Sequence, residues 1–548
     1  MIERGRGRLR GIDRSSLLTV IGLLALAALL RLPDLATRGT WDSDQGHDML
    51  VLRAFVRDGI VPLLGPPTSI GDVHHGAWYY YVLAPAAFLT RGDSPLAVVL
   101  VIALSGIAAV GVTWWLARSI GGPLSGLVAG GLMAISAAAI DESTFIWNPN
   151  LIALSSSVAL AGAWRAWSTG VSRWWLVATL GTALTMQCHI LGAALLPVVG
   201  ALLVADVRRA RGRGPGRGPG RPDGRRHRPG TGTVLACLGI LSVSYLPLVV
   251  SELTTGFGEV RAALDYIAEG RSGEEVALPA RIGIAGLRVV SWPLIGLITS
   301  GFLPAVAATA AVVGIIAWRW RAPTPERVAV RWLGLALLWS TLFLAVTAPS
   351  LATVVAGLPN DHYHAFADPM VFTLVGLGSA ALARSVPGRV LAGTGLVALG
   401  AWNLTHLPPA VHPDGGFPAA DVAAQRVDEV LGAANLERGA VVPIRSLPDF
   451  KSTESMAYPL VRLGRLVSAD TPDGLSPGSV PPPAEPHVSV VLCDSLFETS
   501  IGGACGGPAE ALDEARVQSG AGLHGRLGPL LYRFETAPGR WVSVYGSP

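Results

Sequence analysis

Apolar runs long enough to cross a lipid bilayer recur through the first three quarters of this 548-residue chain. Two of them, residues 16–32 and 96–116, are close to the roughly 20 residues that span the hydrocarbon core. With 51% hydrophobic residues, 15% charged residues and a mean hydropathy of +0.48, the chain is more apolar than a soluble enzyme of this length. The sequence therefore predicts a polytopic α-helical membrane protein with about 11 to 13 transmembrane helices.

The arginines indicate how this bundle is oriented. Five precede the first apolar run, and nine more lie between Arg208 and Arg228. Short arginine-rich loops stay in the cytoplasm, so we expect a cytoplasmic N-terminus and a cytoplasmic loop at residues 207–231. The glycine and proline content of that loop is typical of disorder. Because the positive charges cluster in such loops, the net charge of +4 does not indicate a nucleic-acid partner.

With the N-terminus inside, the segment after the first crossing lies outside the plasma membrane. The polar segments 252–281 and 360–368 come out on the same side, as does the chain beyond the last apolar run, residues 390–404. The helix count is open between residues 78 and 204, because 174–204 reads either as one long helix or as two half-helices broken near His189.

The composition changes at about residue 405. A helical stretch is followed there by the strand-like segments AVVPI and HVSVVLC. We therefore expect residues 1–404 to form the transmembrane domain and residues 405–548 to form a small extracytoplasmic α/β domain. Cys493 and Cys505 could pair in that compartment.

The octapeptide WDSDQGHD follows the first apolar run and carries Asp42, Asp44, His47 and Asp48. The apolar residues after it fall at helical spacing with arginines on another face, which predicts an amphipathic helix in the membrane interface. Carboxylates held against low-dielectric surroundings have raised pKa values and become usable general bases. The same residues would also suit a solvated loop in which Ser43 or Asp44 caps the helix.

Two adjacent histidines, His74 and His75, precede an aromatic run that includes Tyr79. They offer contacts for a phosphate or a metal, and the aromatic rings offer a stacking surface for a sugar or a lipid headgroup. An aromatic belt at the membrane interface would produce the same pattern.

The remaining polar candidates are more scattered. Asn148 and Glu252 lie in segments that we expect outside the membrane. His189 lies inside an apolar segment, where an unpaired histidine is costly, so it is either functional or satisfied by helix packing. His362 and His364 form a His-x-His pair, which by itself is a weak indicator of a metal site.

The order of these features resembles the GT-C superfamily of membrane glycosyltransferases, most closely its glycosyltransferase 39, ArnT-like (PMT-type) family. A first span is followed by the acidic WDSDQGHD, an amphipathic helix ending in DGIVPLL, and a histidine-containing motif before YYY. The resemblance is specific over the segment from residue 1 to about 205 and looser to about 405. It does not cover the tail.

The resemblance implies a polyprenyl-phosphate-linked sugar as donor, drawn from the membrane. It implies transfer with inversion to a hydroxyl of a glycan, lipid or protein acceptor on the outer face. Asp44 matches the family's general base. The family commonly has glutamate at the next position, where this chain has Gln45, so Asp42 or Asp48 would supply the second carboxylate.

Relatives in this family often carry a lysine near the donor phosphate, where this chain has His74 and His75, with Arg53 or Arg57 as alternatives. No cofactor is required, because a polyprenyl phosphate is already an adequate leaving group; a divalent metal ion is compatible with the chemistry. The side chains that we expect to bind substrate are His47, Arg53, His74, His75, Tyr79, Asn148, His189, Glu252, His362 and His364.

A multi-pass transporter or flippase of lipid-linked or envelope glycans is the alternative. Such a protein would show paired charges or broken helices at mid-membrane and matching halves. Here the polar residues gather at helix ends on one side. A scaffold that merely displays the C-terminal domain would leave the clusters at Asp44 and His74 unexplained.

Overall fold

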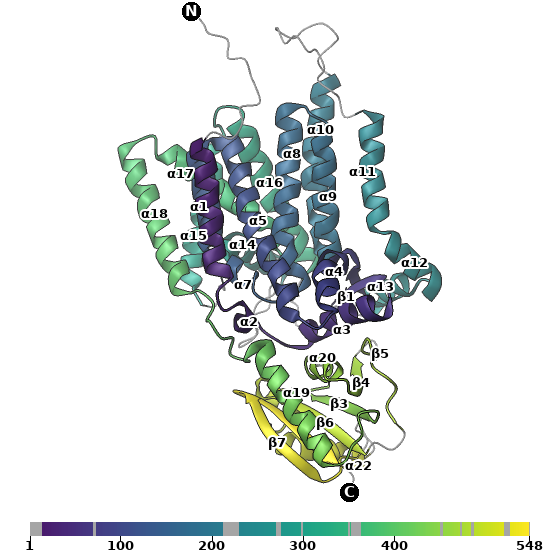
Figure 1. Ribbon diagram of the computed structural model, residues 1–548. Coiled ribbons are helices and arrows are strands. Elements are labelled where there is room, and N and C mark those ends of the chain that lie inside the picture. The colour runs from purple at the N-terminus through teal and green to yellow at the C-terminus, as the bar shows by residue number, and fades with distance from the viewer. Residues whose placement is uncertain are drawn as a thin grey trace, which may run out of the picture.

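The computed structural model describes residues 14–68, 73–211, 230–269, 276–296, 300–348, 351, 363–449, 453–471, 474–483, 487–519 and 526–546. Long helices run side by side as a bundle, and a small sheet domain lies beyond one of its ends (Figure 1). His362 and most of the arginine-rich loop, residues 212–229, lie outside the described residues.

Seven helices in the described part of the chain are long and apolar enough to cross a membrane. The bent pair α11 (Thr231–Ser244) and α12 (Leu246–Thr255), which turns by 45°, would make an eighth span. The seven are α1 (Arg14–Arg31), α5 (Pro95–Gly121), α10 (Leu195–Arg211) with the turn before it, α14 (Leu278–Ile295), α15 (Phe302–Arg319), α16 (Glu326–Thr347) and α17 (Asp368–Leu382) with the turn before it.

Shorter or more polar helices complete the same bundle (Figure 1). They are α6 (Pro123–Ile135), α8 (Ile152–Thr169), α9 (Arg173–Cys188) and α18 (Val386–Thr405). The sequence predicted about 11 to 13 spans, whereas seven helices in the described part of the chain, or eight with the bent pair, are long and apolar enough on their own. The outward face of α18 leaves Val390, Leu391 and Val397 between 64% and 72% exposed, as suits a surface that faces lipid.

The chain is broken at His189. Helix α9 ends at Cys188, the 3₁₀ turn η2 (Ile190–Ala194) follows, and α10 then continues across the bundle. Of the two arrangements that the sequence left open, the structure therefore has the broken one.

Short elements gather at the end of the bundle nearest the sheet domain, opposite the start of α1 (Figure 1). They are α2 (Leu35–Arg38), α3 (Ser43–Asp58), α4 (Trp78–Thr90), α7 (Ala137–Asp141), α13 (Gly258–Glu269), the 3₁₀ turns η1 (Asn148–Leu151) and η4 (Ala365–Ala367), and the hairpin β1 (Leu64–Pro67) and β2 (His74–Gly76). Helix α3 is amphipathic as predicted: Met49, Leu50 and Leu52 are buried, whereas Arg57 and Asp58 are exposed.

The C-terminal domain is built on one six-stranded sheet with strand order β5-β4-β3-β6-β8-β7. Strand β3 pairs in parallel with β4 and β6, and β8 pairs antiparallel with β6 and β7. The strands are β3 (Val441–Leu447), β4 (Leu466–Thr471), β5 (Gly474–Leu475), β6 (Val488–Asp494), β7 (Leu530–Ala537) and β8 (Arg540–Gly546), and the helices are α19 (Gly416–Ala433), α20 (Glu454–Arg462), α21 (Glu498–Ile501) and α22 (Pro508–Gln518).

Strand β6 is rich in valine and buried at successive positions, so the β-branched side chains of VSVVLCD suit a strand covered on both faces. Cys493 at its end forms a disulfide with Cys505. The predicted small C-terminal α/β domain is thus confirmed, and the two tail cysteines pair.

The sheet domain packs directly on the start of α3. The ring of Trp41 lies 4.6 Å from Phe417 and 5.6 Å from Tyr458, measured between centroids, and its Nε1 donates to the carbonyl oxygen of Ser455 at 2.9 Å. Trp41, Met49 and Tyr458 belong to one continuous apolar core. Burial of these aromatic rings therefore joins the sheet domain to the bundle.

Candidate active site

The acidic octapeptide forms the N-terminal turn of α3. Asp42 is the N-cap, and its side chain accepts a hydrogen bond from the backbone N–H of Ser43 at 2.9 Å. In return, Oε1 of Gln45 accepts from the backbone N–H of Asp42 at 2.8 Å, which completes a capping box. The sequence-based assignment of the cap to Ser43 or Asp44 is wrong by one or two residues, because the reciprocal bond from Gln45 selects Asp42.

Gln45 also explains a departure from the family pattern. Its Nε2 donates to the backbone carbonyl of Ile146 at 2.8 Å, and the side chain is buried. A glutamate here would place a second acceptor against that carbonyl, which is unfavourable in a buried site. The amide therefore fixes the helix start to the loop before η1.

The three carboxylates of the octapeptide have different surroundings. Asp44 is exposed in the first turn of α3, where the helix dipole favours a negative charge. Asp42 is half-buried, and its Oδ2 lies 3.2 Å from a guanidinium nitrogen of Arg540. Asp48 is only 1% exposed. Of the three, Asp44 is therefore the most exposed carboxylate, whereas the partly exposed Asp42 is already paired with Arg540.

Asp48 points into the protein and contacts two tyrosines of α4. The hydroxyl of Tyr79 donates to one carboxyl oxygen at 2.6 Å and that of Tyr80 to the other at 2.8 Å. Burial raises the pKa of Asp48 to about 7, although the charge of His47 and the two hydroxyls oppose the shift. Tyr79, which we expected to contact substrate, ties α4 to α3 through this hydrogen bond.

Asp48 gives a testable pH dependence. Its pKa is higher in the folded protein than in the unfolded chain, so the folded state binds the proton more tightly and stability falls as pH rises from about 4 to about 7. Replacing Asp48 with asparagine should remove this component, on the order of a few kcal/mol. Melting temperatures of both proteins between pH 4 and pH 8 would check it; parallel curves would contradict it.

His47, one turn from the cap, faces the sheet domain. Its Nδ1 lies 3.2 Å from a carboxyl oxygen of Glu454, at the start of α20. Burial lowers the pKa of His47, but the hydrogen bond and charge of Glu454 and the charges of Asp48 and Asp44 outweigh burial, so the net shift is upward. The contact between His47 and Glu454 thus joins α3 to α20, and the upward shift favours the charged form of the ring in that contact.

His74 and His75 have opposite surroundings on strand β2. The backbone N–H and the ring Nδ1 of His74 both contact the carboxylate of Glu259 on α13, at 2.7 and 2.8 Å. His75 is buried against His189, with ring centroids 4.4 Å apart, and burial together with the charge of His74 lowers its pKa to about 3. His75 is therefore neutral at physiological pH and would offer a hydrogen bond rather than a charge to a phosphate.

His189 stacks between His75 and Tyr363, whose ring centroid is also 4.4 Å away. Its Nδ1 accepts from the backbone N–H of Leu191 and so caps the turn η2. The ring of Trp147 extends this row of aromatic rings, with its centroid 5.8 Å from that of Tyr363. The row joins the β2 hairpin, the break between α9 and α10, and the segment before η4. Trp147 and Tyr363 are half-buried rings that the sequence did not single out as substrate contacts.

Arg53 and Arg57, the alternatives for the phosphate contact, both form ion pairs with Asp93, in the turn between α4 and α5. Asn148 is buried and donates from Nδ2 to the backbone carbonyl of Cys188 at 2.5 Å, which holds η1 against the end of α9. The structure therefore gives Arg53 and Asn148 intramolecular partners.

A second polar cluster joins the residue before η4, the C-terminal half of α14 and the residue after α7. The indole Nε1 of Trp292 donates to Glu142 at 2.6 Å, and burial raises the pKa of that carboxyl. His364 is buried with its ring edge-on to Trp292, 5.5 Å between centroids. Glu142, in the motif DESTFIWNPN, is a buried acid that sequence reasoning did not assign.

Glu252, near the end of α12, is buried, and neither carboxyl oxygen has a hydrogen-bond partner within the described part of the chain. It does not join the groups around Asp44 through any contact that the structure gives. No three His, Cys, Asp or Glu side chains among the described residues converge as metal ligands. The substrate-binding roles that we assigned from the sequence stay predictions.

No protein-family model and no curated protein sequence matches the chain. Among solved structures it is similar to ArnT from Cupriavidus metallidurans bound to undecaprenyl phosphate, with a TM-score of 0.53 and 14% identity over 97% of this chain and 98% of that one. It is also similar to the Archaeoglobus fulgidus oligosaccharyltransferase complex with Zn and sulfate, with a TM-score of 0.45 and 13% identity over 88% and 68% of the two chains. A third similar structure is the arabinosyltransferase EmbB from Mycobacterium smegmatis, with a TM-score of 0.31 and 14% identity over 74% and 42%.

The similarity to ArnT extends over nearly the full length of both chains, sheet domain included. It shows that the protein has the GT-C membrane glycosyltransferase fold, which confirms the fold predicted from the order of its motifs. At 14% identity, the likeness concerns the fold alone.

Proposed function

We propose that the protein transfers a sugar from a polyprenyl-phosphate donor to an acceptor hydroxyl, with inversion at the anomeric carbon. The observation that carries this proposal is the position of Asp44. Its carboxylate is exposed in the first turn of α3, and α3 lies between the apolar bundle and the sheet domain (Figure 1). A lipid-anchored donor and a polar acceptor meet at such a boundary, because neither can enter the other's solvent.

The proposed step is a single displacement. Asp44 takes the proton of the acceptor hydroxyl while the oxygen of that hydroxyl bonds to the anomeric carbon. The bond between that carbon and the phosphate oxygen breaks, and its electron pair leaves with the polyprenyl phosphate. Attack from the face opposite the leaving group inverts the configuration. No cofactor is needed in this scheme, and chelation of divalent ions in a transfer assay would test for a metal.

The departing phosphate requires cationic or hydrogen-bonding groups. Among our candidates, His74 and Arg57 suit this role because their side chains are 20% and 38% exposed. Each of them already contacts a carboxylate: His74 contacts Glu259 and Arg57 contacts Asp93. A phosphate would compete with those carboxylates for the same donors.

The nature of the lipid carrier is supported by the solved relative. ArnT, whose fold this chain shares, was crystallised bound to undecaprenyl phosphate. The boundary position of Asp44 suits a carrier of that kind, because the polyprenyl chain stays in the bilayer while the phosphate reaches the helix end. The sugar and the acceptor (glycan, lipid or protein) are left open by this reasoning.

We further propose that the N-terminus is cytoplasmic and the sheet domain extracytoplasmic at the plasma membrane. The start of α1, which carries Arg14, and the end of α10, which carries Arg208 and Arg209, lie at the end of the bundle opposite the sheet domain (Figure 1). The disulfide between Cys493 and Cys505 fits an oxidising compartment for that domain. Labelling of cysteines introduced at Asp58 and at Arg14 with an impermeant reagent would place the two ends; label at both in intact cells would contradict the proposal.

The function is tested by incubating the purified protein with a panel of radiolabelled polyprenyl-phosphate sugars and membrane extract as the acceptor source. We expect one donor to yield labelled product and free polyprenyl phosphate in equal amounts, because the step forms one bond for each bond broken. Absence of transfer from every donor would favour a transporter or flippase.

A further inference from the structure

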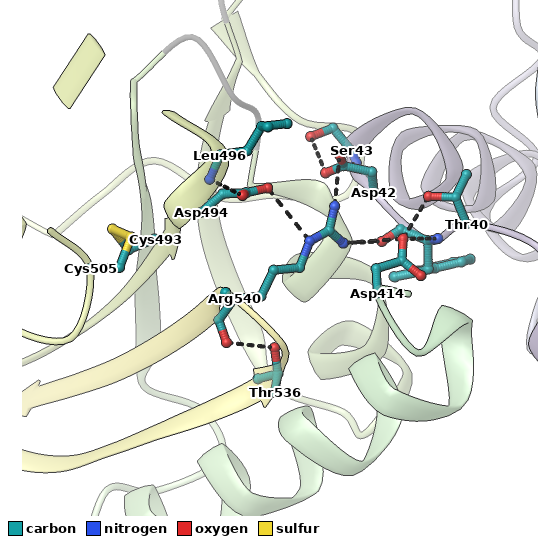
Figure 2. A network of polar contacts seen from close by, with 12 residues as sticks. Thr40, Asp42, Ser43, Asp414, Cys493, Asp494, Leu496, Cys505, Thr536 and Arg540 are labelled. Carbon is teal, nitrogen blue, oxygen red and sulfur yellow. Dashed lines mark hydrogen bonds and ion pairs between the residues drawn. A yellow bond between two sulfur atoms is a disulfide. The ribbon is translucent and has the colours of Figure 1, made fainter. Parts of the chain in front are cut away.

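One arginine of the sheet domain gathers three carboxylates around it (Figure 2). Arg540, the first residue of β8, lies 3.2 Å from Asp42, 3.4 Å from Asp414 and 3.5 Å from Asp494. It also donates to the backbone carbonyl of Trp41 at 2.9 Å. These groups come from the octapeptide, the connector before α19 and the end of β6, so one guanidinium joins three segments that lie far apart in the sequence.

The octapeptide side of this network is the cap of α3. Asp42 uses Oδ1 for the backbone N–H of Ser43 and Oδ2 for Arg540. The neighbouring Asp414 accepts from the backbone N–H of Trp41 at 3.0 Å and from the hydroxyl of Thr40 at 2.6 Å. Arg540 and Asp414 thus contact the segment immediately before Asp44 through the side chains of Thr40 and Asp42 and through the backbone of Trp41.

Asp414 keeps its negative charge at physiological pH. Burial raises the pKa of Asp414. The hydrogen bond and charge of His412, together with the charge of Arg540, lower it by more, so the net pKa is about 2. Without Arg540, three carboxylates would remain close together in a partly buried site, where their mutual repulsion is strong.

A cavity of about 80 Å³ lies in this network, lined by Trp41, Asp42, Asp494, Arg540 and Trp541 among others. Ligand sites for small molecules measure about 300–1,000 Å³, so this space suits a few waters rather than a sugar. The network is therefore better explained as a joint between domains than as a substrate pocket.

We propose that Arg540 is a positioning residue of the transfer site: it fixes the capped start of α3, and hence Asp44, against the sheet domain. Asp44 lies two residues from the carboxylate that Arg540 contacts. A general base works only when it is held within hydrogen-bond reach of the hydroxyl that it deprotonates. The link to catalysis rests on the proposed function, whereas the link to the position of α3 does not.

The test compares amide hydrogen exchange in the first turns of α3 between the full-length wild-type protein and its variants Arg540→Gln and Arg540→Lys. Because a helix cap contributes about 1 kcal/mol, we expect Arg540→Gln to raise exchange there by roughly fivefold to tenfold, with Arg540→Lys in between. Asp42→Asn combined with Arg540→Gln should raise exchange by less than the product of the two single effects. Unchanged exchange in Arg540→Gln would overturn the proposal.

Arg533→Gln is the matched control. Arg533, on the neighbouring strand β7, pairs with Glu510 and donates to Ser543 and to the hydroxyl of Tyr545, all within the sheet domain. This variant should lower the melting temperature but leave α3 exchange unchanged. An equal rise in α3 exchange would show that general loss of domain stability, and not Arg540, is responsible, and would also overturn the proposal.

Transfer kinetics distinguish this inference from the proposed function. If the protein transfers sugar, Arg540→Gln should lower kcat while leaving KM for the donor unchanged, because the proposed phosphate contacts, His74 and Arg57, are not among the groups that Arg540 contacts. A change confined to KM would contradict the positioning role. If the wild-type protein transfers no sugar, the proposed function fails, while the exchange result still decides whether Arg540 positions α3.

Discussion

Transfer activity should fall by about 10²- to 10⁴-fold when Asp44 is replaced by asparagine, which is the range that a positioned general base contributes. The amide keeps the size and the hydrogen-bonding reach of the side chain but cannot accept the acceptor's proton. Because Asp44 is exposed and Asp42 rather than Asp44 caps α3, the variant should insert and fold normally. The measurement is the initial rate of labelled product from the active donor.

Asp58 provides the control for this substitution. It is also an exposed aspartate on α3, at the opposite end of the helix. Asp58→Asn should leave the rate unchanged and, by removing a negative charge from a helix C-terminus, should slightly favour the helix. Substantial transfer by the Asp44→Asn variant, with melting temperatures equal to wild type, would rule out Asp44 as the base.

The second large effect is expected from Gly46→Ala. A Cβ at this position would lie 2.2 Å from the backbone carbonyl oxygen of Glu454 and 2.7 Å from the backbone nitrogen of Ser455. No rotamer change relieves a clash between a Cβ and backbone atoms, so α20 must move away from α3. Overpacking of this kind costs about 1–3 kcal/mol. The contact between His47 and Glu454 would be lost with it.

We therefore expect Gly46→Ala to lower both the melting temperature and the transfer rate. Gly22→Ala is a matched control, because Gly22 is also helical and a Cβ there would meet no atom within 4 Å. That variant should melt at or above the wild-type temperature, since alanine favours a helix over glycine. Equal melting temperatures for the two variants would mean that the sheet domain does not pack on α3 as described.

The predictions for Gly46→Ala and Arg540→Gln share one structural cause, the contact between the sheet domain and the start of α3. Trp41, Gly46 and His47 all face that domain. The tail was outside the sequence resemblance, and its role could not be inferred from the motifs. The structure gives it one, because the groups that orient the octapeptide come largely from α20 and β8.

The partners of the candidate residues show why the sequence could not identify them. His74 meets Glu259, 185 residues away; His47 meets Glu454 across 407 residues; and Asp42 meets Arg540 across 498 residues. No periodicity or spacing connects such pairs, since only the fold brings them together. The local error at the cap had a similar cause: Ser43, Asp44 and Asp42 are all acceptable N-caps by residue type.

The sequence by itself determined the elements whose causes are local. Apolar runs specified the membrane bundle, helical spacing specified the amphipathic α3, and short valine-rich segments specified strands of the tail, because water, lipid and backbone geometry act on each segment separately. Only the tertiary structure decided which acid is exposed. Asp48 turns inward between two tyrosines, Asp42 binds Arg540 and Asp44 faces outward. The physical reason is that burial and charge pairing depend on the distant segments that pack around each carboxylate.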